Sequence, residues 1–164
     1  MDVLRHFQLL ARYNRLANER LYEACAQLPD EEYRKQRKGS FGSIHALLNH
    51  LLLGDRIWTS RFEGGGQTTP PLNTVLYDKF APLRAARVEQ DARIEAFFRD
   101  ASPEFFDRKL RYVNSKGVDR ADDAQMAVAH FFNHQTHHRG QVHVMLAQTA
   151  TPAPSLDLHW LIAP

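Results

Sequence analysis

Residues 3–28 read VLRHFQLLARYNRLANERLYEACAQL, and this stretch decides the fold class. Positions taken alternately four and three apart fall on one face of an α-helix. Asn14 interrupts that face near its middle, and because buried amides need hydrogen-bond partners it predicts a polar spot inside the fold or a contact that sets helix register. Pro29 and Asp30 end the helix. The remaining positions of the face are apolar: Val3, Phe7, Leu10, Ala17, Leu21, Ala24 and Leu28.

Three more helices are predicted, over residues 43–62, 76–101 and 122–148. Ser43 is the expected N-cap of the first, and Asp122 or Asp123 that of the last. The middle one should start nearer residue 80, because Pro82 is tolerated only in a first turn.

The stretches between these helices are short of regular structure. Residues 30–42 are polar and predict a loop, and Gly64-Gly65-Gly66 followed by Pro70-Pro71 breaks the chain. Leu110–Val113 is a candidate short extended piece, and residues 155–164 are expected to pack back on the helices. The fold class is therefore all-α, an antiparallel four-helix bundle, and the length favours one domain over residues 1–164.

Composition and charge exclude several function classes. The chain has 21 Lys and Arg against 19 Asp and Glu, a net charge of +2, which is too weak a bias for a nucleic-acid partner. The single cysteine, Cys25, excludes an internal disulfide and is expected to be a small buried residue. No apolar run is long enough to span a membrane and no targeting segment is evident, so a cytoplasmic protein is expected.

Histidines carry the main chemical signal, because five of the nine fall between residues 130 and 143. His134 and His138 are four residues apart, so they share one face of a helix and can converge on one metal ion. His50, near the middle of the second helix, is the best candidate for a third ligand. Three histidines favour Zn²⁺ or Ni²⁺, with Fe²⁺ as the alternative, and leave a coordination position for a substrate.

Other readings of these histidines stay open. A lone histidine such as His50 more often hydrogen-bonds a carbonyl in the core. His130 extends the stripe too far to share one ion and is expected to pack beside the site, while His137 competes with His138 for the ligand role. Surface or boundary positions are expected for His6, His45, His143 and His159.

Polar residues in the middle of the helices have two readings. Asn14, Arg87 and Gln141 either surround the ligand histidines, whose second ring N–H needs an acceptor, or merely satisfy one another. Gly140, inside the last helix, costs about 1 kcal/mol relative to alanine and indicates a close helix approach next to the site.

Three stretches carry a further pattern: residues 133–141, NHQTHHRGQ; residues 11–18, ARYNRLAN; and Asn49-His50-Leu51 with Asp55-Arg56-Ile57-Trp58. They resemble the last, first and second helices of the DinB-like family, which shares its name with an unrelated DNA polymerase. The resemblance implies a four-helix bundle of DinB-like topology, often a homodimer. It also implies a divalent metal, usually Zn²⁺ or Ni²⁺, on three histidines, here His50, His134 and His138.

The resemblance leaves two functions open. Characterised relatives include transferases and isomerases that use low-molecular-weight thiols. The first hypothesis is therefore a metal-dependent thiol S-transferase acting on a small electrophile in stress or detoxification metabolism. His137 or Arg139 is a candidate to assist, and no catalytic or thiol-binding residue is assigned. The alternative is a non-catalytic, metal-stabilised protein that acts by binding or interaction.

Overall fold

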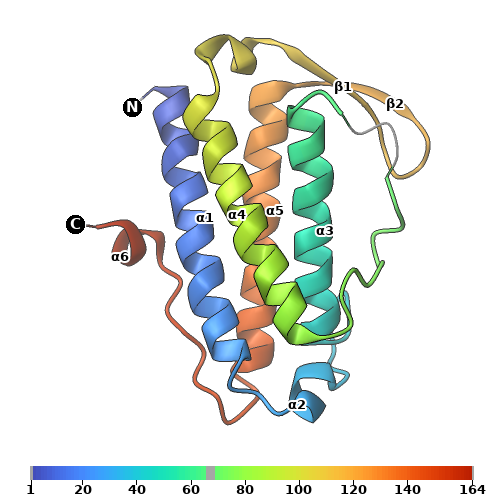
Figure 1. Ribbon diagram of the computed structural model, residues 1–164, viewed down its shortest axis with the longest axis vertical. Coiled ribbons are helices and arrows are strands. Elements are labelled where there is room, and N and C mark those ends of the chain that lie inside the picture. Colours follow the sequence, from blue (N-terminus) through green and yellow to red (C-terminus); the bar gives the residue numbers. More distant parts are fainter. Residues whose placement is uncertain (1, 66–68, 164) are drawn as a thin grey trace.

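The computed structural model describes residues 2–65 and 69–163, and the chain is mostly helical with a small two-stranded sheet. Four long helices lie side by side (Figure 1), where α1 and α3 each pack against both α4 and α5. Their bounds are Val3–Cys25 for α1, Ile44–Phe62 for α3, Phe80–Asp100 for α4 and Ala124–Leu146 for α5.

Side-chain caps start two of the long helices, α1 and α3. Ser43 caps α3 as predicted, since its hydroxyl accepts from the backbone N–H of Ala46 at 3.1 Å. α4 begins at Phe80, which leaves Pro82 in the first turn, also as predicted. Asp123 stands at the N-cap position of α5, as predicted, but its side chain makes no capping bond, and its carboxylate instead pairs with Lys109 at 2.6 Å.

Short elements connect the long helices. α2 (Asp30–Arg34) lies in the stretch predicted as a loop, and η1 (Pro103–Asp107) follows α4. β1 (Lys109–Val113) confirms the predicted extended piece. It pairs antiparallel with β2 (Asp119–Asp123), and the hairpin crosses one end of α3 and α5 (Figure 1). Gly66 of the predicted glycine-rich break lies outside the described residues.

The C-terminal tail packs back on the helices only in part. α6 (Leu158–Ile162) lies against α1, and the Tyr13 hydroxyl donates to the carbonyl of Leu156 at 2.8 Å. Trp160, which was expected to pack inward, is 69% exposed. No helix among residues 2–65 and 69–163 combines the length and apolarity needed to cross a bilayer.

The core is divided into two apolar clusters with a buried polar layer between them. One cluster gathers around Leu21, Leu48 and Leu83, and the other around Phe7, Phe62 and Phe131. Each long helix changes from one cluster to the other through one or two buried polar turns. The polar layer consists of Asn14 and Asn18 of α1, Asp55 and Thr59 of α3, Arg87, Gln90 and Asp91 of α4, and Gln135 and Arg139 of α5.

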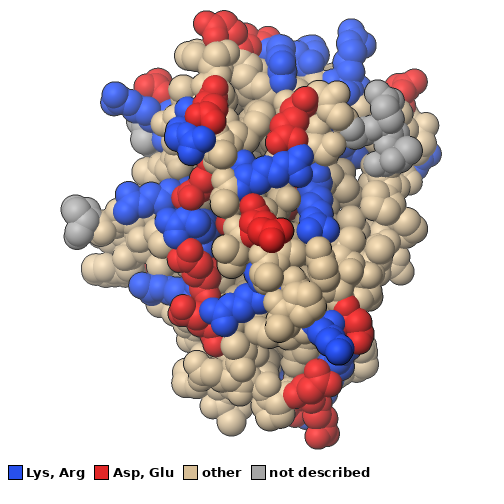
Figure 2. All heavy atoms as spheres, in the orientation of Figure 1, with Lys and Arg blue, Asp and Glu red and all other residues tan. Residues whose placement is uncertain are grey.

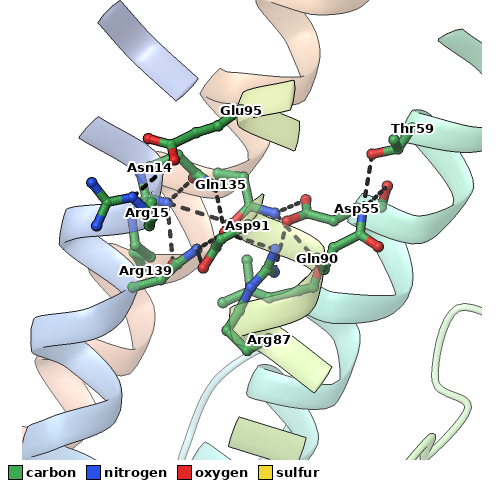
Figure 3. A network of polar contacts seen from close by, with 12 residues as sticks. Asn14, Arg15, Asp55, Thr59, Arg87, Gln90, Asp91, Glu95, Gln135 and Arg139 are labelled. Atoms are coloured by element: carbon green, nitrogen blue, oxygen red, sulfur yellow. Dashed lines mark hydrogen bonds and ion pairs between the residues drawn. The ribbon is translucent and has the colours of Figure 1, made fainter. Parts of the chain in front are cut away.

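Ion pairs and hydrogen bonds join the polar layer across all four helices (Figure 3). Arg87 pairs with Asp55 at 2.7 Å and with Asp91 at 2.9 Å. Asn18 donates to Asp91 at 2.9 Å, and Arg139 donates to Asn14. Burial raises the pKa of Asp55 and of Asp91, although the Arg87 guanidinium opposes that shift.

Candidate metal centre

Three histidine rings from two helices meet at one point. Nε2 of His50, on α3, lies 3.2 Å from Nε2 of His134 and 3.3 Å from Nε2 of His138, both on α5. Two nitrogens that each bind a tetrahedral ion at about 2.0–2.1 Å lie roughly 3.3 Å apart. The separations therefore fit three imidazoles around one metal ion.

The outer ring nitrogens orient two of these rings. Nδ1 of His50 lies 2.9 Å from the carbonyl oxygen of Leu72, and Nδ1 of His138 lies 2.8 Å from Oε1 of Gln141. Because these oxygens only accept, the ring protons reside on Nδ1 and the Nε2 lone pairs face one another. This tautomer is the one that a metal-ligating Nε2 requires.

Burial keeps the rings neutral. It lowers the pKa of His50 and of His138. The pKa of His134 falls to about 3, through burial first and then through the neighbouring histidines. Neutral imidazole is the form that binds a metal, so the three rings are in ligand form at neutral pH.

Two residues shape the cluster from outside. Phe41 stacks on His50 with ring centroids 3.9 Å apart. Gly54 faces His134, and a Cβ at position 54 would lie 3.3 Å from Cε1 of that ring. The absence of a side chain at Gly54 therefore leaves room for His134.

A pocket of about 280 Å³ opens beside the cluster, with His50 and His134 in its wall. Its other end reaches Arg61 of α3 and Tyr112 of β1, below the hairpin. His130 also lines the pocket, where its ring lies 5.3 Å from that of Trp58. A small molecule in this pocket would touch the histidine cluster directly.

The remaining histidines are not part of the three-ring cluster, although the ring of His137 lies 4.8 Å from that of His138. His137 is exposed, with Nε2 at 3.1 Å from Nε2 of Gln141, so the structure favours His138 over His137 as the inward-facing residue. The prediction for His45 is wrong: it is buried, and its Nδ1 lies 3.2 Å from the Tyr33 hydroxyl of α2. His6 and His159 are exposed and His143 is half-buried, as predicted.

The mid-helix polar residues divide between the two readings. Gln141 contacts a ring nitrogen of the cluster, whereas Asn14 and Arg87 belong to the polar layer and satisfy their partners there. Arg139 lies in the same layer, away from the described walls of the pocket that holds the cluster. The close helix approach predicted at Gly140 is wrong, because a Cβ there would meet no atom within 4 Å.

Comparison with known proteins places this architecture in a family. The family model described as "DinB family" matches residues 2–164. The chain belongs to the DinB family. Protein DinB of Bacillus subtilis (strain 168) is 25% identical over 162 residues, which covers 90% of this chain and 88% of that protein.

Membership of the DinB family agrees with the resemblance seen in three stretches of sequence. In this DinB-family chain those stretches supply more than the histidines. Asn14 and Asn18 of the first stretch, Asp55 of the second and Arg139 of the last all belong to the polar layer. Sequence reasoning missed most of that layer, and the available signal was the set of polar residues at mid-helix in every long segment.

Proposed function

We propose that this protein binds one divalent metal ion through His50, His134 and His138 and transfers a low-molecular-weight thiol to a small electrophile. The observation that carries the metal site is that Nε2 of His50 lies 3.2 Å from Nε2 of His134 and 3.3 Å from Nε2 of His138. The donor set favours Zn²⁺ or Ni²⁺, with Fe²⁺ as the alternative. Catalysis is supported by the pocket, which gives a small molecule access to the cluster.

The proposed reaction forms one bond and breaks another. The thiol sulfur forms a bond to carbon of the electrophile, the leaving group departs with the bonding electrons, and the thiol proton passes to water. A divalent ion on three neutral imidazoles lowers the pKa of a bound thiol and so supplies thiolate at neutral pH.

The chain's own residues position these reactants. The Leu72 carbonyl and the Gln141 side chain fix the direction of two rings. Phe41 covers one face of His50, and the pocket wall of Trp58 and Tyr112 presents apolar surface to the electrophile.

The proposal also includes the helix topology, the class of substrate, and the location and oligomeric state of the protein. The packing of α1 and α3 against both α4 and α5 supports a four-helix bundle of DinB-like topology. Positive and negative side chains alternate on the face drawn in Figure 2, which agrees with a small-molecule substrate rather than nucleic acid. A cytoplasmic homodimer remains the expected state of the protein.

Metal content tests the first half of the proposal. Protein purified without a nickel column should carry about one ion per chain. His50→Ala should abolish this binding, and His143→Ala, on the same helix as two of the ligands, should leave it unchanged. Equal metal content in wild type and His50→Ala would remove residue 50 from the site.

Binding of a thiol to the metal is tested separately, by absorption spectroscopy. With Co²⁺ substituted, adding 2-mercaptoethanol should change the visible absorption spectrum as sulfur enters the coordination sphere. An unchanged spectrum would contradict the transferase and leave the metal site standing.

A further inference from the structure

Arg61 is a buried cation at the far end of the pocket from the histidine cluster. It is only 7% exposed. Its guanidinium lies over two neighbouring aromatic rings, 4.7 Å from the centroid of Trp58 and 4.0 Å from that of Tyr112. Nη2 donates to the Thr69 hydroxyl at 2.9 Å and to the carbonyl of Val113 at 3.2 Å.

These partners leave the positive charge without an anion. Nε is buried and has no hydrogen-bond partner in the part of the chain that the structure describes. Within the same residues Arg61 makes no ion pair, and Asp122 beneath Tyr112 is engaged by the Tyr112 hydroxyl and by Arg120 at 2.8 Å. Burial accordingly lowers the pKa of Arg61. A buried charge of this kind is costly unless a partner arrives.

The pocket gives such a partner access. One face of α3 carries His50, Gly54, Trp58 and Arg61 at steps of three and four residues, and all four line the same cavity. His50 and Arg61 are separated by about 16 Å along the helix axis, at 1.5 Å per residue. A ligand between them meets a cation at one end, aromatic walls in the middle and the histidine cluster at the other end.

We propose that Arg61 binds the carboxylate of the small molecule that enters this pocket, so that the substrate class is an organic acid with an apolar or aromatic body. The guanidinium offers charge-assisted hydrogen bonds to carboxylate, while Trp58 and Tyr112 hold its plane in place. Anchoring the acid group at Arg61 directs the rest of the molecule toward His50 and His134. This assignment deepens the proposed function and, for its place in a reaction, rests on it.

Binding of phenylacetate and of neutral phenylacetamide to the full-length, metal-loaded protein tests the proposal. Wild type should bind the carboxylate about tenfold to a hundredfold more tightly, as expected for hydrogen bonds to a charged group. Arg61→Met should bind the two equally. The matched control is Arg111→Met on β1, which removes an exposed positive charge outside the described pocket walls and should keep the preference.

A second arm separates Arg61 from the metal. His50→Ala, which removes a proposed ligand, should still prefer phenylacetate. A preference that disappears in His50→Ala and persists in Arg61→Met would overturn the proposal, because the carboxylate would then be bound at the metal. This result would leave the metal and thiol measurements of the proposed function intact.

A structure of wild type with phenylacetate covers the case in which Arg61→Met does not fold. A carboxylate within hydrogen-bond distance of Arg61 supports the proposal. A carboxylate elsewhere in the pocket, or no preference for phenylacetate in wild type, overturns it.

Discussion

At the scale of single residues, Gly54 is the position where helix stability and site geometry oppose each other. Alanine there should stabilise α3 by about 1 kcal/mol, because glycine is a poor helix former. The same Cβ would lie 3.3 Å from His134 and displace that ring by a few tenths of an ångström. We predict that Gly54→Ala lowers metal affinity about tenfold without lowering the stability of the metal-free protein.

Gly140→Ala is the matched control for Gly54→Ala. It lies in the interior of α5 with open space around its Cβ, so it should add about 1 kcal/mol of stability and leave metal affinity unchanged. Chelator competition and urea unfolding measure the two quantities. Equal metal affinity in Gly54→Ala and wild type would show that His134 adjusts freely.

Gln141 is the second residue with a prediction of its own. Its Oε1 lies 2.8 Å from Nδ1 of His138 and fixes the tautomer of that ring. Gln141→Leu should therefore lower metal affinity about tenfold to a hundredfold, whereas Gln141→Glu keeps an acceptor and should retain it. Titration of both variants with Zn²⁺ measures their metal affinities. A similar loss of affinity in the two variants would argue against an orienting role for Gln141.

At the scale of elements, the polar layer fixes how the four long helices align. Sliding one helix by a turn would bring Arg87 or Asp55 against leucine or phenylalanine of an adjacent apolar cluster. Burying a charge without its partner costs several kcal/mol, so other registers are disfavoured. The layer thus stabilises one alignment of the helices and, with it, the meeting of His50 with His134 and His138.

Arg87→Met tests the energetic role of this layer. Arg87 is 2% exposed and pairs with two buried carboxylates, so its loss should destabilise the fold by about 3–5 kcal/mol. Arg93→Met on the same helix removes only a surface pair with Glu63 and should cost less than about 1 kcal/mol. Urea denaturation compares the two, and similar losses would contradict the assigned role.

Helix-level predictions from the sequence rested on local signals, and those were largely sufficient. Periodicity located the long helices, and Ser43 and Pro82 located two of their starts. β2 was missed because Asp119–Asp123 has no strand-forming composition and is ordered by pairing with β1. His45 was misplaced because α2, which supplies Tyr33, was not foreseen.

The site was predictable to the extent that it is local. The four-residue spacing of His134 and His138 is visible in the sequence, and mid-helix depth pointed to His50. Gly54 and Arg61 were missed because their significance depends on residues from other elements, His134 in one case and Tyr112 in the other.

At the scale of the whole molecule, the proposed ion joins α3 to α5 and should stabilise the fold. At a free metal concentration a thousandfold above its dissociation constant, binding adds about 4 kcal/mol, so chelation should lower Tm by about 10 °C. His50→Ala should show no shift with EDTA. Thermal unfolding with and without EDTA gives both values, and an equal shift in wild type and His50→Ala would contradict the site.

This stabilisation alone does not separate an enzyme from a non-catalytic metal-stabilised protein, since both require the bridge between helices. The change in Co²⁺ absorption on adding thiol does separate them. A structural site has no coordination position left for sulfur.

The connection between α3 and α4 holds both ends of the pocket, because Thr69 contacts Arg61 and Leu72 contacts His50. Because these two contacts are only three residues apart in the chain, we expect a shift at one of them to alter the other. Coupling between two binding sites is reciprocal. If the metal ion at the histidines increases the affinity for the acid, the bound acid increases the affinity for the metal ion by the same factor. Loading of the two ends would then be cooperative, and the chain would retain its metal best while it is occupied.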